Sequence, residues 1–293
     1  MIVVASKPGR LGNRLYLFAH LIGWAIESGG EVSNPSMDEY AGYFRTMQQD
    51  ALCRYPPRKF CPGIGANVRR QIYQASYYAA RLLVRSPVRF KSPRAVALDW
   101  DEQVDLCDPA FFRKATGRGL TFVQGWQFRA PAAVKRHAAT IREFFRPLDE
   151  HEARVAEYIA RARRRGDVLV GVHVRRGDYK NFMGGKYFYE PETYAELLGK
   201  VEALFPGRAA VFLICSDEKL EQESFARFET VAGPGHFLED LYALAACDYI
   251  VGPPSTYTMW ASFYGGTPLY VMRSAEQTPA LEECVVHGID DVA

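Results

Sequence analysis

Apolar residues in the second half of the chain fall into short continuous runs. These runs alternate with stretches in which apolar residues recur three and four positions apart. A continuous run is typical of a strand buried on both faces, whereas the second spacing indicates a helix with one apolar face. Strands that alternate with helices form βαβ units, so the pattern predicts a parallel sheet with right-handed crossovers. The predicted strands cover residues 168–174, 210–215, 249–251 and 269–272, and the predicted helices cover 192–205, a segment after 218, 238–246 and 258–264.

The first half of the chain opens in the same way. A strand over residues 2–5 leads into a glycine-containing turn at Gly9, and the helix that follows has one apolar face and ends at Gly29. Glycine adopts the left-handed backbone conformation that commonly ends a helix. Residues 35–118 show no clear period except for a helix over 66–84, so the pattern does not predict the fold of this segment.

Length and composition favour two domains. A chain of 293 residues, 48% of them hydrophobic, can bury two packed cores, and the two α/β patterns meet near residues 146–149. We therefore predict α/β domains over residues 1–147 and 148–293. The chain starts without a basic leader and has no apolar stretch of membrane-spanning length, so we expect a cytoplasmic protein. The six cysteines form no Cys-x-x-Cys pair, which argues against a zinc site and against a disulfide framework.

Positive charge is concentrated in one segment. The net charge is only +2, yet residues 51–98 contain ten Lys or Arg and no Asp or Glu. Tyrosines are interleaved with these cations on the predicted helix over residues 66–84. Such a surface would suit an anionic acceptor or an anionic membrane, and the alternative is a solvated helix face balanced by acids elsewhere in the fold. Nucleic acid is the least favoured partner, because no recognition motif accompanies the charge.

The strand over residues 168–174 stops in a highly charged turn. His173, Arg175, Arg176 and Asp178 lie at its carboxyl end, where open α/β sheets bind their ligands. The two guanidinium groups could hold a diphosphate, and Asp178 could orient one of them or accept a proton. The alternatives are an ion-paired turn that only ends the strand, and an Arg-Gly-Asp adhesion tripeptide.

Other predicted strand ends carry residues that could bind the same ligand. Gly9 and Gly12 lie in a strand-to-helix turn, where glycine permits close approach of the backbone to a phosphate. Ser255 and Thr256 lie at a helix start and could bind phosphate, or the serine could simply cap the helix. Asp217 also follows a strand and could accept hydrogen bonds from a base or a ribose, or cap a helix. Their common location at strand ends favours one shared ligand.

These motifs together resemble a known family. His173-Val-Arg-Arg-Gly-Asp-Tyr179 resembles the His-x-Arg-Arg-Gly-Asp-Tyr signature of α-1,2-fucosyltransferases, glycosyltransferase family 11, and is similar to the corresponding loop of α-1,6- and protein O-fucosyltransferases. Three further motifs of that family have counterparts in the same order along the chain. They are Gly9-Arg-Leu-Gly-Asn13, Gly125-Trp126-Gln127, and Asp240-Leu-Tyr-x-Leu with Ser255-Thr-Tyr-Thr-x-Trp260.

The resemblance implies a GT-B fold, in which two Rossmann-like domains face a cleft. It implies that GDP-fucose is the donor, held mainly by residues 148–293, and that residues 1–147 meet the acceptor. It also implies inversion at the anomeric carbon, with no bound cofactor or metal. Arg175 or Arg176 would hold the diphosphate, and Asp217 would lie near the guanine. The implied donor-binding residues are Arg175, Gly9, Gly12, Asp217, Ser255, Thr256 and Tyr257, and the implied catalytic residues are Arg176, Asp178, His173 and Asn13.

Transfer to an acceptor hydroxyl requires a base. Asp178 is the favoured base, with Glu190 and His173 as alternatives. Arg14 stands where the resembled family usually has Gln, so the acceptor and the linkage stay open. We expect a glycan acceptor that is anionic or lipid-linked, and an α-1,2 or related linkage in bacterial surface polysaccharide. We also expect weak peripheral association with the inner membrane surface through residues 51–98.

Two other functions compete with this interpretation. Asp99-Trp100-Asp101 has the Asp-x-Asp spacing with which GT-A glycosyltransferases bind a divalent metal and a nucleotide sugar. A metal site there would leave the three phosphate-type loops unexplained. The second competitor is a non-catalytic module that binds a sugar nucleotide or a glycan. Such a module would keep Arg176 and Ser255 but would need no base.

Overall fold

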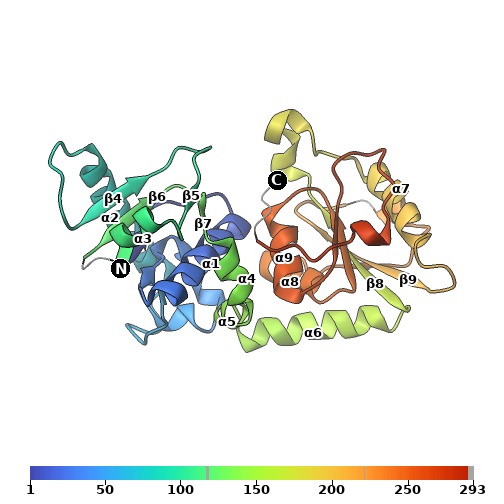
Figure 1. The fold of residues 1–293 in the computed structure, drawn as a ribbon. Coiled ribbons are helices and arrows are strands. Elements are labelled where there is room, and N and C mark those ends of the chain that lie inside the picture. Colours follow the sequence, from blue (N-terminus) through green and yellow to red (C-terminus); the bar gives the residue numbers. More distant parts are fainter. Residues whose placement is uncertain (117–118, 221, 290–293) are drawn as a thin grey trace. The chain divides into compact units, whose positions relative to one another are not determined.

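The computed structural model describes residues 1–116, 119–220 and 222–289, which form two compact units (Figure 1). The amino-terminal unit covers Met1–Leu148 and the carboxyl-terminal unit covers Asp149–Ala293. Each unit contains a five-stranded, largely parallel sheet. The division falls one residue after the boundary that the sequence predicts. In the described part of the chain, no helix is both long enough and apolar enough to cross a membrane.

The sheet of the amino-terminal unit is parallel except at one edge. Its strands are β1 (Ile2–Val4), β2 (Val32–Ser33), β3 (Arg54–Tyr55), β4 (Arg94–Ala97) and β6 (Thr121–Gln124). Their order in space is β3-β2-β1-β6-β4, and β3 is the strand that runs antiparallel to its neighbour. A separate two-stranded ladder pairs β5 (Val104–Asp105) with β7 (Phe128–Arg129). The strand predicted over residues 2–5 is confirmed as β1.

Helix α1 (Leu11–Ser28) is buried along most of its length. Leu15, Phe18 and Ile22 recur three and four positions apart and are fully buried, as expected for the inner face of a helix. Gly29 ends the helix in the left-handed conformation, with φ of 62°, which confirms the predicted end. The other helices of this unit are α2 (Ala66–Arg85), α3 (Pro109–Thr116), α4 (Pro131–Arg136) and α5 (Ala138–Phe144).

Buried polar contacts, not a periodic apolar face, hold the middle of the amino-terminal unit. Arg69 on α2 is buried, and its guanidinium donates to the carbonyl oxygens of Gln48 and Asp50 at 3.1 and 2.5 Å. The carboxylate of Asp50 pairs with Arg54 at 2.8 Å. Such contacts leave no period in the sequence, which explains why only α2 was predictable here. Between β2 and β3 the chain forms the short 3-10 helices η1 (Pro35–Met37), η2 (Ala41–Tyr43) and η3 (Met47–Gln49).

The carboxyl-terminal unit contains a fully parallel sheet. Its strands are β8 (Val168–Val174), β9 (Ala210–Ser216), β10 (Thr230–Ala232), β11 (Tyr249–Gly252) and β12 (Leu269–Val271), and its helices are α6 (Asp149–Arg163), α7 (Pro191–Glu202), α8 (Phe237–Ala245) and α9 (Thr256–Gly265). The order in space is β10-β9-β8-β11-β12, so the direction of sheet growth reverses at β8. Every residue of the central strand β8 is buried. The predicted parallel sheet is therefore confirmed.

One predicted helix of the carboxyl-terminal unit is wrong. The described residues after position 218 contain a short 3-10 helix, η6 (Gln222–Phe225), in place of an α-helix. This turn leads into β10, an edge strand that pairs with β9 and that the pattern did not reveal. Of the three residues of β10 only Val231 is buried, so the strand offers no apolar run from which to detect it.

A close approach of α9 to α8 fixes the helix that begins after β11. A Cβ atom added to Gly265 would lie 1.9 Å from the carbonyl oxygen of Ala245. Thr267 Oγ1 donates to that same oxygen at 2.7 Å, and Ser262 Oγ donates to the Thr267 carbonyl at 2.6 Å. The end of α9 is therefore locked to the end of α8 through a backbone contact that leaves no room for a side chain.

We expect Gly265→Ala to lower the free energy of unfolding by about 2 kcal/mol or more, because no rotamer change relieves a clash with a backbone carbonyl. Gly42→Ala is the control. Gly42 is exposed and an added Cβ would meet nothing within 4 Å, so its effect should stay within about 0.5 kcal/mol. Urea unfolding followed by circular dichroism measures both variants, and equal losses would contradict the packing argument.

Candidate active site

Three loops meet at the carboxyl edge of the carboxyl-terminal sheet. They follow β8, β9 and β11 and comprise residues 175–179, here called the arginine turn, 217–220 and 253–255. β8 pairs with both β9 and β11, and the strand order reverses there. In open α/β sheets the crevice at such a reversal is where ligands bind. The structure thus brings together the arginine turn, Asp217 and Ser255, which the sequence singles out.

The Arg175 guanidinium lies between two carboxylates. Its Nη2 is 2.6 Å from Asp178 Oδ1, and its Nη1 is 3.4 Å from Asp217 Oδ2. Its buried Nε has no hydrogen-bond partner among the described residues. The guanidinium also lies over the Tyr179 ring, and the Tyr179 hydroxyl donates to the Pro254 carbonyl at 2.5 Å. Arg175 therefore joins the arginine turn to the loop after β9, with one N–H unsatisfied, and Tyr179 joins the turn to the loop after β11.

Asp217 fixes the arginine turn from the neighbouring strand. Its Oδ1 accepts the backbone N–H of Arg176 at 3.0 Å, while Oδ2 faces the Arg175 guanidinium. A Cβ atom on Gly177 would lie 2.7 Å from Oδ2, so the turn can close on this carboxylate because residue 177 is glycine. These contacts give Asp217 a positioning role. Its expected contact with a guanine stays a prediction.

Arg176 is tied to a different set of groups. Its Nη1 lies 2.5 Å from Glu190 Oε2 and its Nε lies 3.3 Å from Glu218 Oε2. The hydrogen bond with Glu190 raises the pKa of Arg176, so the guanidinium stays charged. It also packs over the ring of Phe188 at 4.8 Å. Each arginine is held by two carboxylates, but Arg175 keeps a buried Nε without a partner among the described residues, so Arg175 is the better candidate for a phosphate ligand.

His173 lacks the properties of a catalytic base. Its side chain is buried, its ring stacks on that of Tyr257 with 4.9 Å between centroids, and burial lowers its pKa to about 3. A group with so low a pKa holds a proton too weakly to act as an efficient base at neutral pH. The Tyr257 hydroxyl in turn donates to the Phe237 carbonyl at 2.6 Å. This pair joins β8 to α8 and α9, so the expected catalytic role of His173 is not supported.

The start of α9 faces the same edge of the sheet. Ser255 caps the helix, since its Oγ accepts the N–H of Tyr257 at 3.1 Å. The sequence anticipates this capping role as the alternative to phosphate binding. Thr256 begins the helix one residue later. Backbone N–H groups of the first turn and the positive end of the helix dipole favour an anion at this position, whichever role Ser255 has.

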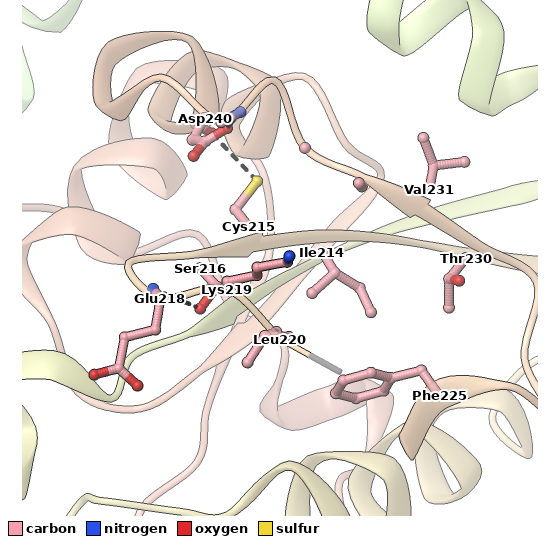
Figure 2. Close-up of a pocket in the computed structure, with 13 residues that line it drawn as sticks. Ile214, Cys215, Ser216, Glu218, Lys219, Leu220, Phe225, Thr230, Val231 and Asp240 are labelled. Carbon is pink, nitrogen blue, oxygen red and sulfur yellow. Dashed lines mark hydrogen bonds between the residues drawn. The ribbon is translucent and has the colours of Figure 1, made fainter. Parts of the chain in front are cut away.

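A cavity of about 300 Å³ lies beside β9 and β10 (Figure 2). The ends of the two strands form one side, and Leu220 and Phe225 add apolar surface. Glu218 and Lys219 come from the loop after β9, and Asp240 comes from α8. A volume at the lower end of the range for small-molecule pockets suits a single ring system.

Asp240 is a buried carboxylate on this cavity that was not among the predicted site residues. It accepts the N–H of Gly235 at 2.9 Å, and burial raises its pKa to about 6. A Cβ atom on Gly233 would lie 3.0 Å from its Oδ1, so the glycines let the backbone wrap around the carboxylate. The available signal was a pair of acids, Glu239 and Asp240, in the first turn of a helix that is apolar elsewhere. A raised carboxyl pKa in a cavity is typical of a functional site.

The predicted residues of the first turn lie in the amino-terminal unit, between β1 and α1. Gly9 has φ of 48°, and a Cβ atom there would lie 2.5 Å from Nδ2 of Asn13, so the asparagine side chain folds back over the glycine. Arg14 is buried and donates to the Ser36 carbonyl at 2.8 Å. Glycine at position 9 thus has a local packing cause. A role of Gly12 and Asn13 in closing a cleft stays a prediction.

The Asp-x-Asp stretch lies in an exposed loop of the amino-terminal unit. The Trp100 carbonyl, between Asp99 and Asp101, accepts hydrogen bonds from Trp126 Nε1 and Gln127 Nε2 at 3.3 and 3.0 Å. The Gly-Trp-Gln motif therefore holds this loop in position. The alternative of a GT-A fold is wrong, because the chain forms two α/β units, each with its own largely parallel sheet.

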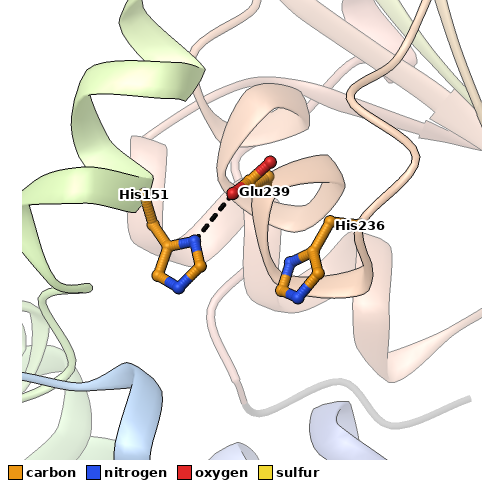
Figure 3. A group of neighbouring side chains, drawn as sticks. All are labelled: His151, His236 and Glu239. Carbon is orange, nitrogen blue, oxygen red and sulfur yellow. Dashed lines mark hydrogen bonds and ion pairs between the residues drawn. The ribbon is translucent and has the colours of Figure 1, made fainter.

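One group of described side chains could offer metal ligands (Figure 3). His151 from α6, with His236 and Glu239 at the start of α8, brings one ligand atom from each residue within 4.8 Å. His151 Nδ1 lies 2.7 Å from Glu239 Oε1, and the two imidazole rings stack at 5.3 Å. Arg154 Nη1 lies 2.9 Å from the same carboxylate oxygen and would repel a cation. We assign this group to the packing of α6 on α8.

Two α/β units with largely parallel sheets are the architecture expected of a GT-B glycosyltransferase. Residues 137–279 match the sequence profile of glycosyl transferase family 11. This region contains the arginine turn, the cavity with Asp240 and the start of α9. The matched region covers just under half of the chain, so residues 137–279 resemble family 11 as the motifs predict, and the predicted enzyme class, a glycosyltransferase, is confirmed. No curated protein sequence matches the chain.

Solved structures with a similar fold are fucosyltransferases. A mutant of FUT1 from Arabidopsis thaliana in complex with GDP is 14% identical, with a TM-score of 0.63 over 97% of this chain and 73% of the other. Fucosyltransferase NodZ from Bradyrhizobium is 16% identical, with a TM-score of 0.55 over 92% and 94%. NodZ α-1,6-fucosyltransferase soaked with GDP-fucose is 17% identical, with a TM-score of 0.54 over the same shares. These likenesses confirm the predicted GT-B fold.

The raised pKa of Asp240 makes stability depend on pH. The folded carboxyl group retains its proton up to about pH 6, whereas the unfolded one loses it near its ordinary value of 3.8. The stability that the protonated group contributes is therefore lost as pH rises through this interval. Relative to Asp240→Asn, the native protein should lose up to about 3 kcal/mol of unfolding free energy between pH 4 and pH 7.

Urea unfolding at pH 4, 5, 6 and 7 measures this difference. Asp248→Asn is the control, because burial alone would raise the pKa of Asp248 but hydrogen bonds from Arg163 and Leu169 outweigh it and lower that pKa. The native protein should therefore gain stability relative to Asp248→Asn as pH rises. A pH-independent difference at Asp240 would contradict the assigned burial.

Proposed function

We propose that the protein transfers fucose from GDP-fucose to a hydroxyl group of a glycan. One observation carries the proposal. Arg175, the start of α9 and the cavity with Asp240 lie along the carboxyl edge of one parallel sheet. Their charges and hydrogen-bonding groups complement the diphosphate and the guanine of a GDP-sugar. The family 11 match supports glycosyl transfer, and the NodZ structure soaked with GDP-fucose supports this donor.

The diphosphate would bind between Arg175 and the first turn of α9. The guanidinium offers a charged, fork-shaped donor set, and the helix start offers backbone N–H groups. Arg176, held by Glu190 and Glu218, would add positive potential without direct contact. Leaving-group charge on GDP would thus be stabilised by protein groups when the bond to the sugar breaks.

Guanine would occupy the cavity beside β9 and β10. Its N1–H and its 2-amino group are two donors on one edge, and a carboxylate accepts both. Asp240 is the buried carboxylate that could accept them. Phe225 and Leu220 would contact the faces of the ring. Binding of guanine favours the ionised form of Asp240, so GDP affinity would fall as pH drops below about 6.

Asp178 is the favoured base, and donor binding would release it. The carboxylate of Asp178 is about half exposed and lies 2.6 Å from the Arg175 guanidinium. A diphosphate on Arg175 would compete for that guanidinium and leave Asp178 to accept the acceptor proton. The acceptor oxygen would attack the anomeric carbon as the bond to GDP breaks, with inversion. Glu190 is the second candidate base, although it is paired with Arg176.

The acceptor would be a glycan hydroxyl, with an α-1,2 or related linkage in bacterial surface polysaccharide. The acid-free segment of residues 51–98 supports an acceptor that is anionic or lipid-linked. Gly12 and Asn13, from the turn after β1, would take part on the acceptor side. The protein would work in the cytoplasm, at the inner membrane surface. A non-catalytic module that binds the sugar nucleotide is the competing function, and it would bind GDP-fucose without turnover.

We expect Arg175→Ala to weaken GDP binding roughly 10- to 100-fold, the loss for a hydrogen bond to a charged group, with the fold intact. Arg176→Ala should cost less, because Glu190 and Glu218 hold that side chain, whereas Arg175 keeps a buried Nε without a partner among the described residues. Arg208→Ala is the control, since Arg208 donates to the Asp167 carbonyl at the opposite end of the sheet. Titration calorimetry with GDP measures all three. Unchanged affinity in folded Arg175→Ala would refute the assignment.

The Asp240→Asn variant tests the base site. An amide offers one acceptor and one donor, which suits xanthine, where a carbonyl replaces the 2-amino group of guanine. We therefore expect GDP affinity to fall at least about tenfold while binding of xanthosine diphosphate improves. Asp248→Asn, a half-buried aspartate away from the cavity, should change neither. Equal losses for both nucleotides in Asp240→Asn would remove Asp240 from base recognition.

A further inference from the structure

Apolar side chains are exposed together on one part of the amino-terminal unit. They belong to the end of α2 and to the segment that follows it. Tyr78, Leu82, Val84, Val88 and Phe90 are exposed by 60, 73, 46, 59 and 46%. We call these five residues the apolar patch. Single exposed apolar residues are ordinary on protein surfaces, but five large ones within thirteen positions of sequence indicate a surface that contacts another molecule.

The opposite face of α2 accounts for its packing. Ala80 is fully buried with Val3, Ala5 and Phe122 in a small core, and Leu83 packs against that core. Residues four and seven positions apart share one face of a helix, so Tyr78, Leu82 and Arg85 point together away from it. The apolar patch therefore does not contribute to the hydrophobic core of the amino-terminal unit.

The structure separates the ten cations of residues 51–98 into those that pair or pack within their own unit and those that lie beside the apolar patch. Arg54 pairs with Asp50, Arg58 pairs with Glu31, and Arg69 is buried against backbone carbonyls. These three cations interact with groups of their own unit. By contrast Arg85, Arg89 and Lys91 are exposed. They alternate in sequence with Val84, Val88 and Phe90, so cations and apolar groups lie on the same short stretch.

We propose that this stretch, residues 78–91, docks the protein on an anionic membrane surface. Charge complementarity identifies the partner: the stretch carries cations without any acid, and an anionic leaflet attracts such clusters. The apolar side chains distinguish a membrane from a nucleic acid, because they can enter the boundary between headgroups and acyl chains. An amphipathic surface of this kind binds reversibly, with electrostatic attraction added to apolar burial. The docking is independent of the donor site, which lies in the other unit.

Co-sedimentation with vesicles tests the proposal. Vesicles of phosphatidylglycerol with phosphatidylcholine should bind the full chain at least about tenfold more tightly than phosphatidylcholine alone, and salt should weaken this binding as it screens the charges. Arg85→Glu with Arg89→Glu and Lys91→Glu should reduce binding at least about tenfold. Leu82→Ser with Val88→Ser and Phe90→Ser should also reduce it, yet leave the remaining binding sensitive to salt.

Two matched variants serve as controls. Arg161→Glu with Arg164→Glu reverses exposed cations on the carboxyl-terminal unit, and Val286→Ser removes an apolar side chain exposed by 50%. Both should bind vesicles as the native protein does. Circular dichroism and urea unfolding of each variant should match those of the native protein, which shows that each is folded. GDP affinity should also be unchanged, which separates this proposal from the donor assignment.

Three results would overturn the proposal. Equal recovery on anionic and neutral vesicles would remove the electrostatic partner. Light scattering could instead reveal a dimer that the serine variant dissociates, and the patch would then contact a second copy of the chain. Retention of an oligonucleotide in a mobility shift, without vesicle binding, would assign the cations to nucleic acid.

Discussion

The candidate site depends on the interaction between the Asp217 carboxylate and the arginine turn. Asp217 lies directly after β9 and contacts the turn twice, through the N–H of Arg176 and the guanidinium of Arg175. A backbone N–H beyond the end of a strand has no partner in the sheet and needs another acceptor. A charged acceptor makes this bond stronger than a neutral one. Gly177 then fits only because it has no side chain to meet Asp217.

This constraint separates two neighbouring arginines by environment. Successive residues at a strand end project to opposite sides, so Arg175 and Arg176 cannot share one set of partners. Arg175 lies with Asp178 and the Tyr179 ring, beside the loop after β11, whereas Arg176 lies with glutamates. An Arg-Arg pair in a sequence does not reveal this difference. Both arginines face two carboxylates, but Arg175 also keeps a buried Nε without a partner among the described residues.

A strand, helix or site residue could be predicted only where its contacts leave a pattern of apolar and polar residues in the sequence. β8 was predicted to the residue because a central parallel strand is buried on both faces and reads as one apolar run. The loops at the sheet edge were predicted because charged residues follow the runs of β8 and β9, and hydroxyl-bearing residues follow that of β11. Asp240 was missed as a site residue, since its burial and its bond to Gly235 depend on how the chain folds around it. β10 and residues 35–118, apart from α2, were missed because isolated buried residues and polar contacts carry no period.

The role of each charged residue also depends on the fold and is not given by its position in the sequence. A count along the sequence treats ten cations as equivalent, but Arg54 pairs with the buried Asp50, Arg69 is buried against backbone carbonyls, and Arg58 forms a surface ion pair with Glu31. Exposed Arg85 and its neighbours differ from them by what surrounds them, which is exposed apolar surface. Long-range attraction alone would hold the protein near any anionic surface and would be lost at high salt. Apolar side chains beside the cations add a short-range term that salt does not screen, and together the two favour a membrane over a soluble polyanion.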